Sequence, residues 1–453
     1  MNLRFGKIFS IAVLTLLFPQ IMKAQENRPA LELTLEKAIQ IALSENPMII
    51  VAEKEIQKID YSKKSAWYNI LPSLDATGQH AKYLVPASMA MMGQIINSPT
   101  DNTTQVGLQL SLPLFVPALW HTIKMTTLDM QLAVEKAHAS KIALRNDVKK
   151  AYYGVLLAQD SYKTLQSGYA LAEEVYMQAK NRFELGLSPE FDVISAEVQM
   201  KNLQPNILEI ENAIEQAKMF LKVLMGLDVV QPIVINENLN NYEIYINSTN
   251  TLGDLTLKSN TDLKQLNIQQ QQLQKGLTMQ RTQRMPTLVA FSTYGYQGMA
   301  NRATQINFGG MPIQVEKSSD WYSQGLLVGL QMNVPLTGIY TNIAKEKQTE
   351  IQINQLAMQR NYLEESLNLQ VKAAVNDMDK AIKQAESAKG NEKLAQKGYN
   401  ISLSRYETGM GTVLELQNAS LSLTQAQLSY KQAIVSYLNS KADLDKTLGI
   451  DIN

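Results

Sequence analysis

The 453-residue chain contains no cysteine and only three histidines, His80, His121 and His138. The absence of cysteine excludes disulfides, thiolate zinc sites, a cysteine nucleophile and a lipid-modified N-terminal cysteine. The histidines have no spacing typical of a metal site, and no pair of carboxylates has catalytic spacing. We therefore predict that the protein is not an enzyme and that it uses no metal and no cofactor.

Charge is scarce and balanced. Lysine plus arginine and aspartate plus glutamate each number 42, and charged residues make up 19% of the chain. An average soluble protein has roughly 25% charged residues. Without an overall positive field, nucleic acid is not an expected partner.

Residues 1–24 are predicted to be a secretory signal peptide. Arg4 and Lys7 precede a short apolar run, and cleavage is expected after Ala24, although Met22 is larger than the usual residue at its position. This run is too short to cross a bilayer, and no other stretch offers the roughly 20 apolar residues of a membrane helix. The protein is expected to be exported and, if it enters a membrane, to do so as a β-barrel.

An internal duplication organises the chain. An apolar residue recurs every three or four positions from Val193 to Leu224, which is typical of a helix in a coiled coil. The same pattern starts again at Leu416, 223 positions after Val193. The segment before each helix also repeats, as RFELG at 182–186 and RYETG at 405–409. The duplicated unit is therefore predicted to be a long helical hairpin with a glycine turn.

In one part of each repeat, the spacing of apolar residues changes from the three or four positions of a helix to the two positions of a β-strand. Alternation is clear over 106–114 and 328–336, and the expected partner strands are 73–83 and 287–297. In a soluble sandwich the apolar face would form a core, whereas in an outer-membrane barrel it would face lipid, and the pattern alone does not separate the two. Aromatic residues that we place near the strand ends, where a barrel has its interfacial aromatics, are Tyr83, Tyr294, Tyr296, Trp321 and Tyr322.

Each repeat is expected to contain a helix, two strands and the long hairpin. We divide the chain into a first repeat at 25–228, a connector at 229–259 and a second repeat at 260–453. Each outgoing helix, from a proline to Gly186 or Gly409, would be ~100 Å long at 1.5 Å per residue.

Four strands in one chain do not close a barrel around water. Several chains sharing one barrel would remove this problem. Three copies would give twelve strands and four would give sixteen, and the strand count alone does not choose between them.

The chain resembles the TolC-like outer-membrane factors. The resemblance rests on LTLEKAI at 33–39, Asn46-Pro47, Leu71-Pro72, LPLF at 112–115 and the two glycine tips, in that order. It implies a mainly α protein with a membrane β-barrel, in which duplicated long helical hairpins form a periplasmic α-barrel. It also implies a homotrimer with a shared twelve-stranded barrel in outer-membrane lipid, extending into the periplasm. The implied partners are a periplasmic adaptor and an inner-membrane transporter, either proton-driven or ABC.

The resemblance also assigns roles to the hairpin ends. Docking of the adaptor is expected at two turns, formed by Leu185, Gly186, Leu187 and Ser188 and by Thr408, Gly409, Met410 and Gly411. A periplasmic gate is expected to involve Asp192, Tyr406, Glu415 and Asn418. Asn418 and Gly411 stand where the family has a second ring carboxylate and an arginine, so those two features are not carried over.

The assignment of Glu415 to the gate has a simpler alternative. Glu415 would also suit the first turn of a helix, where the helix dipole favours acidic residues. Arg182 and Arg405 are interpreted as solvated surface partners of the neighbouring Glu184 and Glu407, each pair contributing under about 1 kcal/mol.

The predicted function is a passive exit duct of a tripartite efflux pump. One alternative is the outer-membrane duct of a type I protein-secretion system, and another is an exported soluble coiled-coil scaffold.

Overall fold

The computed structural model describes residues 30–91, 94–243, 256–308, 311–336 and 339–450, so the predicted signal peptide lies outside the described residues. The chain forms two compact units. The first contains residues up to Val51, Ala139–Asn260 and residues from Leu367, and the second contains Ala52–His138 and Thr261–Ser366. Each unit therefore combines segments from both predicted repeats. Within the described residues, no helix is long and apolar enough to cross a membrane.

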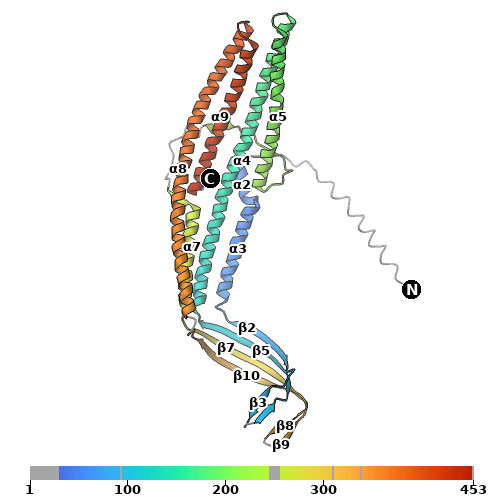
Figure 1. Ribbon diagram of the computed structural model, residues 1–453, viewed down its shortest axis with the longest axis vertical. Coiled ribbons are helices and arrows are strands. Elements are labelled where there is room, and N and C mark those ends of the chain that lie inside the picture. Colours follow the sequence, from blue (N-terminus) through green and yellow to red (C-terminus); the bar gives the residue numbers. More distant parts are fainter. Residues whose placement is uncertain (1–29, 92–93, 244–255, 309–310, 337–338, 451–453) are drawn as a thin grey trace, which may run out of the picture. The chain divides into compact units, whose positions relative to one another are not determined.

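The second unit contains a four-stranded antiparallel sheet in the order β10-β7-β5-β2 (Figure 1). These strands are β2 (Ser73–Lys82), β5 (Thr100–Phe115), β7 (Thr287–Asn301) and β10 (Ser318–Asn333). Apolar side chains that alternate along β5 and β10 are 43% to 71% exposed, apart from the half-buried Leu112; Val106, Leu110 and Val328 are among the exposed ones. This face is not the core of a sandwich, since the described part of the chain does not cover it.

The loops between paired strands contain more structure than expected. Two short hairpins extend the sheet region, formed by β3 (Ser88–Met91) with β4 (Gln94–Asn97) and by β8 (Thr304–Phe308) with β9 (Met311–Val315). Strand β7 continues to Asn301, so Tyr294 and Tyr296 lie in its middle, opposite Leu108 and Val106. The prediction that these two tyrosines mark a strand end was wrong, because β7 continues past 297 through Gly298 to Asn301, where no apolar alternation marks a strand.

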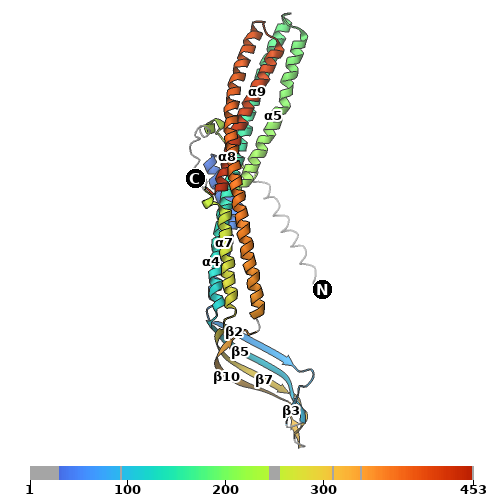
Figure 2. The same ribbon diagram turned by 60° about the vertical axis from the view of Figure 1, so that its left-hand side comes forward.

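Helices make up the rest of the two units. Three of the described helices have residues in both units: α3 (Pro47–Tyr68), α4 (Pro117–Glu184) and α8 (Ile339–Glu407). The second unit also contains α7 (Thr261–Thr282), and the first contains α2 (Leu35–Glu45), α5 (Glu190–Met225) and α9 (Val413–Leu448). Figures 1 and 2 show α4 with α5 and α8 with α9 as two hairpins of the first unit.

The predicted heptad positions face the interior of these hairpins. On α5, Ala196, Leu203 and Leu221 are buried, and the other apolar positions of the pattern are half-buried. On α9, Leu416 and Leu423 of the repeated pattern are buried. The duplicated coiled-coil pattern therefore reports the packing correctly.

Equivalent asparagines join the helices of the first unit in both repeats. Asn46 donates its side-chain amide to the Leu224 carbonyl at 2.8 Å, and Asn260 donates to the Thr447 carbonyl at the same distance. Gly226, which follows α5, has φ of 71°, and a Cβ there would lie 2.4 Å from the Glu45 carbonyl oxygen. The duplication is therefore present in individual contacts as well as in element order.

The connector packs on the core of the first unit. It contains β6 (Ile233–Val234) and the 3-10 helices η1 (Leu239–Tyr242) and η2 (Leu257–Ser259). The Glu237 carboxylate accepts hydrogen bonds from the hydroxyls of Tyr152 at 3.0 Å and Tyr242 at 2.6 Å. Burial raises the pKa of both tyrosines, and the hydrogen bonds to Glu237 raise it further. Strand β6 pairs in parallel with β1 (Leu31–Glu32), a pairing the sequence did not indicate.

Candidate functional site

The predicted docking and gate residues lie at the ends of the two hairpins in the first unit. Each outgoing helix ends at a glycine in the left-handed region, Gly186 with φ of 70° and Gly409 with φ of 74°. The Leu187 N–H donates to the Arg182 carbonyl at 2.7 Å, and the equivalent bond joins Met410 to Arg405 at 2.8 Å. Glycine adopts this conformation without a Cβ clash, so both helices stop at the same place in the repeat.

The two turns expose apolar side chains. Leu185 is 73% exposed, Leu187 is 66% exposed and Met410 is 71% exposed. In contrast, hydroxyls beside them bond locally: Ser188 donates to the Ala179 carbonyl at 3.5 Å, and Thr408 donates to the Ser404 carbonyl at 2.9 Å. The turns therefore combine a fixed backbone with apolar contact area that the described chain leaves uncovered.

Tyr406 lies in a buried cluster that joins the ends of the two hairpins. It is 4% exposed and packs in a cluster with Ala179, Ala196 and Leu416. Its hydroxyl has no hydrogen-bond partner among the described residues. Burial raises the pKa of Tyr406, and the negative charge of Asp192 raises it as well. The positive charge of Arg182, in contrast, lowers the pKa of Tyr406. Asp192, which the sequence analysis assigned to the same gate, lies in the first turn of α5 and is half-buried.

Arg182 connects the first hairpin to Tyr406 of the second. Its Nη1 donates to the Tyr406 carbonyl at 2.7 Å, and its guanidinium lies 5.1 Å from the centre of the Tyr406 ring. The interpretation of Arg182 as a surface partner of Glu184 was wrong, because the packing of the hairpins offers it a carbonyl and an aromatic face. The sequence feature that could have pointed to this contact was the position of Arg182 in the repeat, four residues before the glycine of the turn.

Glu415 has a different environment from Asp192. Its backbone N–H donates to Thr412 Oγ1 at 3.2 Å, as expected for the first turn of a capped helix. Its carboxylate lies 3.6 Å from Arg405, and both side chains are about half exposed, at 48% and 53%. Arg405 therefore pairs with Glu415 rather than with Glu407. Asn418 is also exposed.

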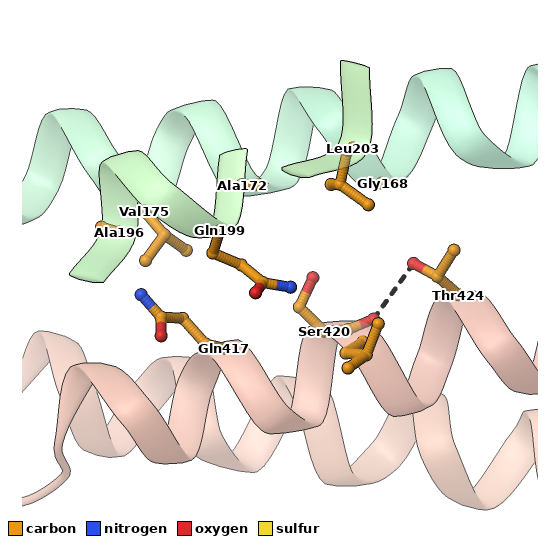
Figure 3. A pocket seen from close by; sticks show the side chains of 10 residues that line it. Gly168, Ala172, Val175, Ala196, Gln199, Leu203, Gln417, Ser420 and Thr424 are labelled. Atoms are coloured by element: carbon orange, nitrogen blue, oxygen red, sulfur yellow. Dashed lines mark hydrogen bonds between the residues drawn. The ribbon is translucent and has the colours of Figure 1, made fainter. Parts of the chain in front are cut away.

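A narrow, mainly apolar space lies between the hairpins beside this cluster, and Val175 and Ala196 belong to both. Figure 3 shows Gln199 and Gln417 pointing into a cavity of about 10 Å³ between α4, α5 and α9. Ser195 donates to the Gln417 amide oxygen at 3.2 Å, while the buried Gln417 amide nitrogen has no partner in the described chain. Such a volume holds about one water molecule, so it does not bind cargo.

Metal binding has no support in the described part of the chain. No group of three or more histidine, aspartate or glutamate side chains there could hold an ion.

Comparisons with known proteins agree with this architecture. The family described as "Outer membrane efflux protein" matches residues 38–227 and 252–450. The outer membrane protein TolC of Vibrio cholerae is 21% identical over 343 residues, covering 76% of each chain. The probable efflux pump outer membrane protein TtgC of Pseudomonas putida is 24% identical over 210 residues, covering 45% of this chain and 42% of its own.

Solved structures show the same fold. The CusC channel structure has a TM-score of 0.72 at 15% identity and covers 92% of both chains. The CmeC outer membrane channel of Campylobacter jejuni has a TM-score of 0.69 at 17% identity, covering 92% of this chain and 85% of its own.

These matches confirm the predicted fold class and location. The long duplicated hairpins and the strand pairs are those of outer-membrane channels that extend into the periplasm, which are not enzymes. The family match covers both repeats, so the chain belongs to the outer membrane efflux protein family.

Proposed function

We propose that three copies of this chain form the exit duct of a tripartite efflux pump. The observation that carries the proposal is an apolar stripe on α5 that a single chain leaves exposed. Its members are 52% to 73% exposed: Phe191, Ile194, Val198, Leu208, Phe220 and Val223. A stripe of this length on a helix requires a partner, and a second copy offers a helix edge of matching length.

The sheet supports the same assembly. Strands β2 and β10 each have one edge without a partner among the described residues. Open edges of long strands tend to pair with another chain. Three copies joined edge to edge would give a closed barrel of twelve strands, with the exposed apolar face toward lipid.

The hairpin ends have two roles in this proposal. The exposed apolar turns, from Leu185 to Ser188 and from Thr408 to Gly411, dock the periplasmic adaptor. The gate lies beside them, where Arg182 of the first hairpin binds Tyr406 of the second, and Asp192 belongs to the same proposed gate. Glu415 and Asn418 face solvent, and three copies of Glu415 around one axis would form a carboxylate ring that attracts cations.

Efflux is favoured over protein secretion by the relatives. TtgC and its relative ArpC are named as outer membrane proteins of efflux and antibiotic efflux pumps. The second candidate is a type I secretion duct, which would use the same trimer with an ABC exporter.

The test is complementation. Cells that lack their own duct would receive this chain together with the adaptor and transporter encoded beside it. Restored export of small toxic compounds, with the adaptor and transporter co-purifying with a trimer, supports the proposal. Restored export of a protein substrate alone would favour secretion, and a monomer outside the membrane fraction would overturn the duct.

A further inference from the structure

A long groove in the first unit has no charged side chain among the described residues that line it. Its volume is about 1200 Å³, and α4, α5, α8 and α9 all contribute to its lining. The polar residues of the lining are serine, glutamine and asparagine, although 19% of the chain is charged. A neutral lining of this size is therefore a property of this face and not of the whole chain.

The neutral residues on α9 follow the heptad repeat. Ser422, Ser429 and Ser436 are seven positions apart and all line the groove. Tyr430 and Tyr437, each one position after a serine of this set, are buried. Residues seven apart lie on one face of a helix in a coiled coil, so the serines form a continuous stripe that faces away from the core.

Helix α8 places its charges outside the groove. Gln384 and Asn391, also seven apart, line it, whereas Glu386 and Lys389 between them do not. Lys389 instead binds the Glu243 carboxylate of the connector at 2.8 Å. Along these turns of α8, neutral residues therefore face the groove and charged residues lie on other faces of the helix.

The groove is larger than a small-molecule pocket, which usually has about 300–1000 Å³ and converging polar groups. We propose that it is the inner wall of the duct over this stretch, and that its neutrality lets cationic and anionic cargo pass alike. Serine and glutamine side chains donate and accept hydrogen bonds and so keep the wall hydrated. A wall of one charge would instead concentrate ions of opposite sign. Selection by charge is then left to other stretches, such as the hairpin ends and the adjoining hollow on α8 that Asp379, Lys380 and Lys383 line, a conclusion that rests on the proposed duct.

The absence of cysteine makes a direct test possible. Ser429→Cys introduces a single thiol on the groove wall. Ser167→Cys is the matched control: Ser167 is exposed, is not among the residues that line the groove, and lies about 160° round α4 from the lining residue Leu165. Purified trimers in planar bilayers are treated from the external side with a cationic and an anionic methanethiosulfonate of similar size.

We expect both reagents to lower the conductance of Ser429→Cys irreversibly. The two rates, each divided by the rate with a free thiol, should differ by less than ~3-fold, whereas a charged wall would change them by tenfold or more. Ser167→Cys should be modified, as seen by mass spectrometry, without a change in conductance. Ser422→Cys, one heptad earlier, repeats the test if Ser429→Cys does not assemble.

The failures are distinguishable. If neither unsubstituted trimers nor trimers with the gate substitution Arg182→Gln carry current, the proposed duct is wrong. If they conduct and modification at both serines leaves the conductance unchanged, the groove is not the wall. If modification changes the conductance but one reagent reacts tenfold faster, the wall is not neutral.

Discussion

Replacing Arg182 by glutamine removes the contacts through which the first hairpin holds Tyr406. The lost interactions are a hydrogen bond from a charged donor to the Tyr406 carbonyl at 2.7 Å and a guanidinium 5.1 Å from its ring. A hydrogen bond to a charged group contributes about 1.5–3 kcal/mol, and a cation–π contact at a half-exposed site adds roughly 0.5–1 kcal/mol. Glutamine recovers part of the hydrogen bond, so we expect a loss of about 2 kcal/mol in each copy.

This loss should appear as easier opening of the proposed gate. A change of about 2 kcal/mol shifts a two-state equilibrium roughly 30-fold, and a concerted opening of three copies would shift it further. The measurement is the open fraction of single channels in planar bilayers. Arg182→Lys keeps the charge but loses the planar fork, so its open fraction should lie between those of the wild type and Arg182→Gln.

Lys180→Gln is the matched control, since Lys180 is an exposed cation two positions earlier on the same helix. Thermal unfolding of each trimer establishes that assembly is intact. If Arg182→Gln and Lys180→Gln have the same open fraction, the reasoning from Arg182 to the gate is refuted.

Three further predictions concern the same unit. Glu415→Gln should weaken channel block by multivalent cations added at the periplasmic side, because it removes the carboxylate ring; unchanged block in single-channel recordings would exclude Glu415 from the gate. Gly186→Val should abolish drug resistance while trimers still assemble, because a β-branched residue is strained at φ of 70°; persistent resistance would show that this turn does not dock the adaptor. Burial and a hydrogen bond to Glu243 raise the pKa of Tyr430 to about 12, above the unfolded value of about 10. Its contribution to the free energy of unfolding is therefore complete below about pH 10 and is lost as pH rises toward 12. The decline in unfolding temperature between pH 9 and 11 should thus be smaller in Tyr430→Phe, and an equal decline would contradict the shift.

Periodicity predicted the parts of the fold that depend on many residues at once. The heptad pattern located the buried face of α5, and the repeated glycines located the ends of α4 and α8. Long amphipathic helices can be predicted because the same spacing of apolar residues is repeated at each turn.

Contacts made by only a few residues could not be predicted from the sequence. Strand β1 has two residues and pairs with β6 about 200 positions away, as Leu31 with Ile233, too short a segment for any period. The partner of Arg182 depends on how two hairpins pack, and Glu184 was the nearer candidate in sequence. Tyr294 and Tyr296 were misplaced because β7 extends past 297 through Gly298 to Asn301, which show no apolar alternation.

The two hairpin ends share their turns but not their environments, and this difference separates docking from gating. Three pairs of residues occupy equivalent repeat positions: Arg182 and Arg405, Phe183 and Tyr406, Asp192 and Glu415. Phe183 is 43% exposed, whereas Tyr406 is 4% exposed. Similarly, Arg182 reaches the other hairpin, whereas Arg405 pairs with Glu415 beside its own turn.

In the first two pairs, only one member therefore takes part in the contact between the hairpins, namely Arg182 and Tyr406. Separation of the two ends would break the contacts of Arg182 with Tyr406, while each glycine turn keeps the local hydrogen bonds from its own helix. In the proposed duct, an adaptor bound to the turns can thus remain in place while the gate opens. Substitutions at Arg182 should then change the opening of the gate without changing adaptor affinity. Substitutions at Gly186 should weaken adaptor binding without changing the opening of the gate.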